Sequence, residues 1–196
     1  MVTVSVSILV ALGGYLATYA YSLRLAQRKD RLERVNNQLS DFYGPLLALI
    51  TAGHSSWLAF RKRYRSRKPF FWESDPPPTP EEAAAWRLWM TEVFMPLNLA
   101  MVDVITHHAD LLEESEMPQC LLDACAHVEA YRPVLKRWEA GDFSENTSLI
   151  SFPSEELLRY VEEAFVRLKK RQSKLFGDRP AGAAVAPERL HPSESS

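Results

Sequence analysis

Two aspartate–histidine pairs with the same spacing are the residues best suited to do chemistry. Asp103 and His107 are four residues apart, as are Asp123 and His127, so the members of each pair would project together from a helix. Imidazole and carboxylate groups bind divalent metals, and two such pairs on neighbouring helices could form a site. The helical period argues against it, because it places Asp123 about 140° and His127 about 100° from the centre of their apolar face, toward water. We therefore expect a polar boundary and no metal.

No other pattern indicates catalysis. The chain contains neither a Gly-x-Ser-x-Gly nucleophile elbow nor a glycine-rich phosphate loop. Cys120 and Cys125 have a spacing that fits no zinc or redox motif. We predict that the protein is not an enzyme and that it carries no cofactor.

Helices must position these residues. Alanine, leucine, glutamate and arginine are plentiful and only seven residues are glycine, a balance that favours an all-α fold. Apolar residues recur at helical spacing in the stretches 24–42, 45–66, 79–114, 118–140 and 154–176. Pro96 and Pro133 lie inside two of these stretches and should bend them. We expect an N-terminal transmembrane helix followed by a bundle of about four helices with proline kinks.

Charge divides the chain into regions. Residues 24–68 hold eleven Lys and Arg against three Asp and Glu, residues 73–163 hold five against nineteen, and residues 164–196 hold seven against three. We assign a transmembrane anchor to 1–23, a helical domain to 24–176 and a disordered tail to 177–196. Within the domain we expect a basic neck (24–68), a loop (69–80), acidic helices (81–140) and a closing helix (154–176).

The first 23 residues carry no charged side chain. About 20 helical residues cross the hydrocarbon core of a bilayer, so this segment predicts a single membrane span. Arg24, Arg28 and Lys29 follow at once, and the positive-inside rule then puts the N-terminus outside and the C-terminal domain in the cytosol or an equivalent compartment. A cleaved signal peptide and a buried core helix are the alternatives.

Small residues recur along one face of the predicted span. Ser7, Ala11, Gly14 and Thr18 are three or four residues apart, a spacing that lets two membrane helices pack closely. A homodimer through the anchor is therefore an open possibility.

A second basic run, Arg61–Lys68, follows the Gly44-Pro45 dipeptide. If Gly44-Pro45 forms a hairpin turn, the preceding and following helices, each about 30 Å long, bring this run back to the membrane. We favour that hairpin over a kink, which would leave the run as a solvated helix end. The expected membrane-interface residues are Arg24, Arg28, Lys29, Arg61, Lys62, Arg63, Phe70, Phe71 and Trp72. Nucleic acid is a disfavoured partner, because the domain is acidic and no recognition motif surrounds the run.

The segment Arg31–Leu49 contains the pattern Asn-x-Gln-Leu-x-x-Phe-Tyr-Gly-Pro-Leu. In this it resembles an uncharacterised family of N-terminally membrane-anchored helical proteins. The resemblance implies an anchor followed by helices and implies no activity.

Taken together, the sequence favours a membrane-tethered helical scaffold or adaptor whose partners are membrane lipid and one or more proteins. The alternative is a sensor domain that binds a small ligand or a metal in a pocket near His107, His108, Trp86 and Trp89.

Overall fold

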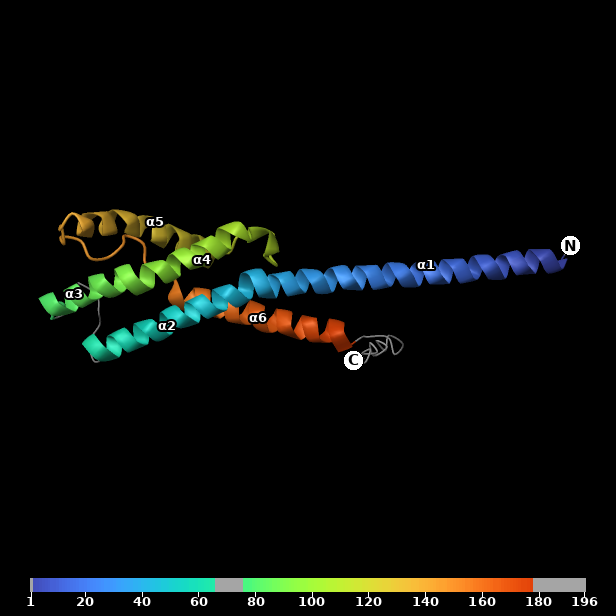
Figure 1. The fold of residues 1–196 in the computed structure, drawn as a ribbon, viewed down its shortest axis with the longest axis horizontal. Coiled ribbons are helices and arrows are strands. Elements are labelled where there is room, and N and C mark those ends of the chain that lie inside the picture. The colour runs from blue at the N-terminus through green and yellow to red at the C-terminus, as the bar shows by residue number, and fades with distance from the viewer. Residues whose placement is uncertain (1, 66–75, 178–196) are drawn as a thin grey trace, which may run out of the picture.

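A computed structural model describes the backbone of residues 2–65 and 76–177, with side chains from residue 12 onward. Every regular element in these ranges is helical (Figure 1), which confirms the all-α prediction and the bundle of about four helices. The elements in order are α1 (Val2–Asn37), the π-turn η1 (Gln38–Tyr43), α2 (Gly44–Tyr64), α3 (Pro80–Trp89), the π-turn η2 (Met90–Phe94), α4 (Met95–His107), the short 3₁₀ turn η3 (Ala109–Leu111), α5 (Gln119–Glu139) and α6 (Ser154–Gly177).

The predicted hairpin at Gly44-Pro45 is wrong. α1, η1 and α2 form one continuous helix, and Gly44 itself has helical dihedral angles (φ −66°, ψ −53°). The wider turn of η1 explains how Pro45 fits inside a helix. The Gly44 N–H donates to the carbonyl of Leu39, five residues back, so the hydrogen-bonding pattern shifts just before Pro45, which has no N–H to donate.

Gly44 is required by this π-turn. A Cβ atom at this position would lie 2.3 Å from the Leu39 carbonyl oxygen, inside contact distance. The absence of a side chain at Gly44 therefore allows the backbone to approach the Leu39 carbonyl inside a helix, and it does not mark a turn of the chain.

The same device recurs before Pro96. Thr79 and Glu82 form a capping box at the start of α3, and η2 then shifts the helix so that the Met95 N–H donates to the carbonyl of Met90. This shift changes which residues of the helix face the core. The residues buried in η2 and α4 are Met90, Phe94, Met95, Asn98, Met101 and Ile105, whereas the helical period alone favours Trp86, Trp89 or Met90, Val93, Leu97, Ala100, Val104, His108 and Leu111. The helix also ends at His107 rather than near 114.

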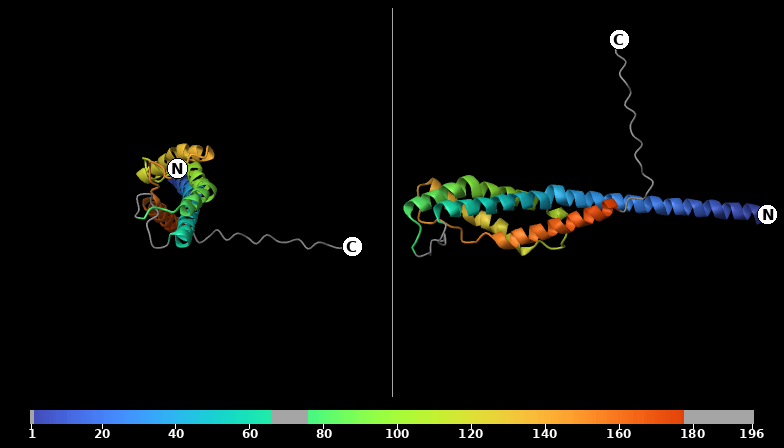
Figure 2. Two further views of the ribbon diagram at one scale, coloured as in Figure 1. Left: turned by 90° about the vertical axis from the view of Figure 1, so that its left-hand side faces the viewer. Right: turned by 90° about the horizontal axis from the view of Figure 1, so that it is seen from below.

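The bundle buries two groups of apolar side chains. The first lies where α1, η1, α2, α4, α5 and α6 meet, and includes Phe42, Tyr43 and Leu46. The second, which we call the aromatic cluster, surrounds Phe60 and consists of Phe60, Met90, Phe94, Met95, Val128, Tyr131, Val134 and Trp138 with partly buried neighbours such as Trp57, Trp86 and Trp89. α6 packs back along α1 and α2 (Figure 2), where Gln172 Nε2 donates to Asn36 Oδ1 at 2.7 Å.

The N-terminal part of α1 projects beyond the bundle (Figures 1 and 2). Residues 12–27, which we call the arm, are all exposed, and their large apolar side chains are Leu12, Tyr15, Leu16, Tyr19, Tyr21, Leu23 and Leu25. The side chains of Ser7 and Ala11 lie outside the described residues. Thr18 Oγ1 donates to the Gly14 carbonyl at 2.9 Å within the helix.

By length and composition, one helix among the described residues is apolar enough to cross a membrane, namely Pro80–His107. A third of its most apolar window is buried inside the molecule, and Met101 and Ile105 within it are almost fully buried. A core helix passes the same test, so this result by itself is weak evidence for a membrane span.

Candidate functional site

A cavity of about 470 Å³ lies among the helices of the bundle. Its walls come from α2, from the helix that runs through α3, η2 and α4, from α5, and from the segment between α5 and α6. No Asp, Glu, Lys or Arg is among the described residues that line it. A volume of this size with mixed apolar and polar walls is typical of a small-molecule site.

Three aromatic side chains form one wall of the cavity. The ring of Trp57 lies edge-on to Trp86 at 6.0 Å and to Phe94 at 6.2 Å between centroids, and Trp86 lies 5.9 Å from Phe94. Such tilted and edge-on pairs are the favoured arrangements of aromatic rings. The π-turn η2 sets the relative direction of the Trp86 and Phe94 side chains around the helix. A regular helical period does not predict this direction.

The segment 143–153 passes beside the cavity. Hydrogen bonds from tryptophan and tyrosine side chains to its backbone carbonyls hold it in place. Trp86 Nε1 and the Tyr131 hydroxyl both donate to the Asn146 carbonyl, at 2.7 and 2.9 Å. Trp138 Nε1 donates to the Glu145 carbonyl at 2.7 Å. Burial raises the pKa of Tyr131 well above its ordinary value, so its hydroxyl keeps the proton that it donates. The segment is thereby fixed as a wall of the cavity.

His127 is buried beneath the same segment, with 6% of its surface exposed. Its Nδ1 lies 2.5 Å from the Ile150 carbonyl, which fixes Nδ1 as the protonated nitrogen because a carbonyl only accepts. Burial lowers the pKa of His127, against a smaller opposite effect of this hydrogen bond. The prediction that His127 points toward water is wrong. The helical period describes α5 alone and omits the loop that folds over it.

Asn98 contributes a buried amide to the cavity. The residue is 8% exposed and lines the cavity from α4. Its side chain makes no hydrogen bond to any residue in the described ranges 2–65 and 76–177. Its amide atoms are not among the fully buried, unpartnered side-chain atoms of the described residues, so the amide opens onto the cavity. Sequence reasoning missed it, since an isolated asparagine in a helix carries no motif.

The two Asp–His pairs do not come together. Asp103 and His107 are on the surface, with side chains 71% and 69% exposed, and pair with each other at 3.0 Å. Asp123 accepts from Gln119 on its own helix, while His127 turns inward. Within the described part of the chain, no three His, Cys, Asp or Glu residues are grouped to hold a metal. Asp103 and His107 thus form an exposed pair on the surface of α4.

The predicted ligand pocket is divided in the structure. Trp86 lines the cavity, whereas Trp89, His107 and His108 do not. Cys120 and Cys125 are half-buried free thiols on α5, and burial raises the pKa of each.

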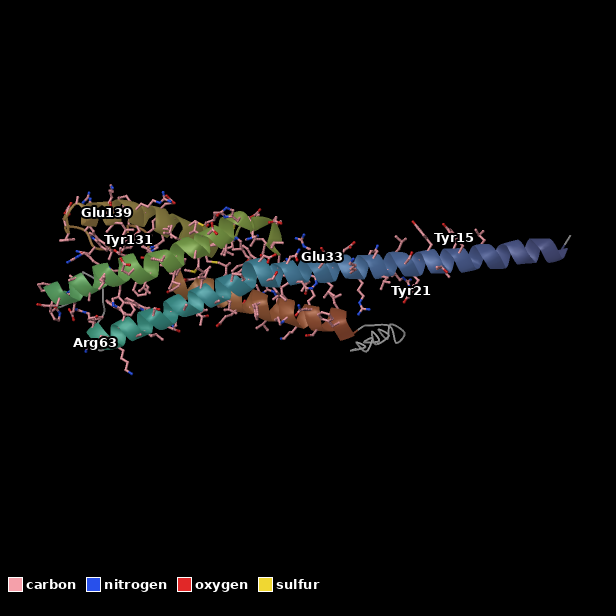
Figure 3. The ribbon with its side chains drawn as sticks, in the orientation of Figure 1. Tyr15, Tyr21, Glu33, Arg63, Tyr131 and Glu139 are labelled. Carbon is pink, nitrogen blue, oxygen red and sulfur yellow. The ribbon has the colours of Figure 1, made fainter. Side chains whose placement is uncertain are left out.

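The expected membrane-interface residues fall into two groups. Arg24, within the last turn of the arm, and Lys29, just beyond it, are exposed, and Arg28 Nε donates to the Leu175 carbonyl at 3.0 Å, close to the end of α6. Lys62 and Arg63 are also exposed, but Arg63 lies at the opposite end of the molecule from Tyr15 and Tyr21 (Figure 3). The continuous helix thus removes the reason for placing Arg61–Arg63 at the membrane. Phe70, Phe71 and Trp72 lie outside the described residues.

One member of the second basic run has a structural role. The Arg65 side chain is 2% exposed, and its Nη1 lies 2.8 Å from Glu82 Oε2. Since Glu82 also completes the capping box of α3, this ion pair joins the end of α2 to the start of α3. Arg61 lies over the ring of Trp57 at 5.8 Å.

A chain of hydrogen bonds links η1 to α6 at the other end of the bundle. The Tyr43 and Tyr160 hydroxyls are 3.2 Å apart, and the Tyr160 hydroxyl donates to Glu114 Oε2 at 2.9 Å. Burial raises the pKa of Tyr43 and of Tyr160, so both hydroxyls stay protonated. The arrangement fastens three segments together around the π-turn.

No protein-family model, curated protein or solved structure matches this chain. The site must therefore be interpreted from its own geometry.

Proposed function

We propose that this protein is a single-pass membrane-tethered helical scaffold or adaptor, anchored by the N-terminal part of α1. The observation that carries the proposal is the arm. Its large apolar side chains are about half exposed or more, with Leu12 at 53%, Leu16 at 55% and Tyr15 at 67%. A continuous apolar surface of this kind on an isolated helix is unfavourable in water and favourable in lipid.

Positive charge at the root of the arm supports the same proposal. Arg24 and Lys29 follow the uncharged segment on α1, and the Arg28–Leu175 hydrogen bond brings the end of α6 to the same level. Arg28 is five residues beyond Leu23, which corresponds to about 7.5 Å along the helix. The last turns of α6 are basic and contain Lys169, Lys170, Arg171 and Lys174. Two segments far apart in sequence thus supply cations where anionic headgroups would lie.

The partner-binding half of the proposal is supported by the opposite end of the bundle. Leu58 on α2 and Leu88 on α3 are 54% and 61% exposed, and this end is the one farthest from the arm (Figure 1). A tether that enters the membrane at one end would present the other end to proteins in the adjoining compartment. Under the positive-inside rule that compartment is the cytosol or its equivalent.

Carbonate extraction of membranes tests the tether. The full chain should stay in the membrane pellet, and a version that starts at Gln27 should be released, because it retains Arg28 and the buried part of the bundle but lacks all apolar side chains of the arm. Recovery of both versions in the soluble fraction would overturn the proposal. The adaptor half predicts a protein recovered with the solubilised full chain and lost from its Leu88→Arg variant, with Leu122→Arg, 46% exposed on α5, as the control.

A second candidate function, a small-ligand sensor, is favoured by the cavity. It differs from the pocket expected from sequence, since it keeps Trp86 and replaces His107 and His108 with Trp57, Asn98 and His127. Binding of any small molecule at this cavity would support this function, and it does not depend on the tether.

A further inference from the structure

We propose that the cavity binds an uncharged, ring-bearing small molecule and that the Asn98 amide recognises the polar group of that molecule. The proposal rests on the second candidate function, the small-ligand sensor, and names the class of ligand. It depends on three properties of the cavity: the charge of its lining, the rings in its wall and the buried amide.

The lining excludes charged ligands. No acidic or basic side chain is among the described residues that line the cavity, so a buried ion would lose its hydration without gaining a counter-charge. His127 does not supply one, because burial favours its neutral form. The hydroxyl groups of the lining, such as those of Thr147 and Ser148, offer hydrogen bonds rather than charge.

The wall favours a planar ring. Trp57, Trp86 and Phe94 present their rings at mutual centroid distances of 5.9–6.2 Å, and Met90 and Met101 add flexible apolar surface. A ring placed against this wall gains both apolar burial and aromatic contact. Methionine side chains adapt to irregular ligand shapes.

Asn98 provides the specificity. The residue is 92% buried and lines the cavity, and its amide makes no hydrogen bond to the described residues. The amide atoms are not among the fully buried, unpartnered side-chain atoms of the described residues, so they open onto the cavity. Leucine or methionine at this position would continue the apolar face of Met101 and Ile105 but would offer no hydrogen bond. A ligand in the cavity would donate to Oδ1 of this amide or accept from its Nδ2.

Fluorine NMR of the full chain labelled with 5-fluorotryptophan in detergent tests this proposal. The five tryptophans give separate resonances, assigned with Trp57→Phe and Trp86→Phe variants. Three probes share one ring system: indole is neutral and has an N–H, 1-methylindole is neutral without it, and indole-3-carboxylate is anionic. We expect indole to shift the Trp57 and Trp86 resonances saturably, leaving Trp138 unmoved. The anion should bind at least tenfold more weakly.

The role of Asn98 is tested by how strongly the cavity prefers a ligand that carries an N–H group. We expect indole to bind about tenfold more tightly than 1-methylindole, the size of one buried hydrogen bond, and Asn98→Leu to reduce that preference below twofold. Asn98→Ala serves if the leucine variant does not fold, and Asn37→Leu, on the surface of α1, is the matched control. Equal binding of the anion, or a preference that survives in both Asn98 variants, overturns the ligand class while the sensor function stands. If no probe shifts Trp57 or Trp86, both fail.

Discussion

Apolar side chains are exposed in the arm and buried in the next part of the same helix. From residue 12 to 27 every side chain is exposed, whereas Val35, Leu39 and Phe42, further along the same continuous helix, are 1%, 8% and 0% exposed. Both parts are helical and both are rich in apolar residues. The difference is that α4 and α6 cover the inner part, while no described segment covers the arm.

This contrast shows that hydropathy alone does not separate a core helix from the proposed membrane segment. Pro80–His107 is apolar enough to pass the same test as a membrane helix, yet Met101 and Ile105 within it are core residues. What distinguishes the arm is that its apolar surface has no protein partner within the described structure and ends at a group of cations. Each experiment that follows tests whether the arm and the bundle differ in this way.

Charges placed in the arm should release the protein from membranes. Each arginine near the centre of a membrane helix costs about 3 kcal/mol, so Leu12→Arg combined with Leu16→Arg should shift most of the protein out of the carbonate pellet. The bundle should keep its unfolding midpoint, because neither side chain packs against it. Leu58→Arg combined with Leu88→Arg is the control, since these leucines are exposed to a similar extent but lie on the bundle. Equal release of both double variants from the membrane pellet would contradict the proposed difference between the arm and the bundle.

Removal of the Arg65 side chain should destabilise the bundle strongly. Arg65→Ala leaves Glu82 without its partner at a largely buried site, and breaking such a pair costs about 3 kcal/mol. Urea unfolding measures the change, and Arg63→Ala, two residues away and exposed, should change the free energy of unfolding by less than about 0.5 kcal/mol. Equal effects would show that the basic run is a solvated helix end throughout.

Substitution of Gly44 should destabilise the inner part of the long helix. The methyl group of Gly44→Ala meets the Leu39 carbonyl and forces the π-turn to open, at a cost of about 2 kcal/mol. The matched change is Gly53→Ala in α2, where a Cβ meets nothing within 4 Å. It should stabilise the helix by about 0.5–1 kcal/mol. A stable Gly44→Ala variant would show that the π-turn is dispensable.

Acid should weaken the bundle through His127. Burial lowers its pKa in the folded state, so between that value and the unfolded value of about 6.5 the unfolded chain binds more protons. Stability is therefore full above pH 6.5 and falls as the pH drops below it. Urea midpoints at pH 7.5 and 5.5 should differ more for the wild type than for His127→Gln. Identical differences would mean that protonation of the buried ring costs nothing.

The sequence predicts the helices well because their signals are local. The capping box at Thr79, the basic end of α6 and the positive-φ Gly141 after α5 each follow from nearest neighbours along the chain. The outcome at Pro45 and Pro96 was not predictable in this way. A proline's missing N–H can be accommodated by a hairpin, a kink or a π-turn, and the packing of distant helices decides among them.

The cavity was partly predictable. Trp86 belongs to the pocket expected from sequence, but Asn98 and His127 acquire their burial from segments far away in sequence. His127 is covered by Ile150, 23 residues later, and Asn98 faces inward only because η2 shifts the helical register. The helical period along the chain predicts the burial of neither residue.

The most direct test of the tether is the depth of the arm in a membrane. A nitroxide label is placed at residue 16 or residue 58, which are 55% and 54% exposed, in a chain whose Cys120 and Cys125 are replaced by alanine and which is reconstituted in lipid vesicles. If the account is correct, label 16 collides readily with dissolved oxygen and is shielded from a water-soluble nickel chelate, while label 58 shows the reverse. Equal access of the nickel chelate to both labels would contradict it.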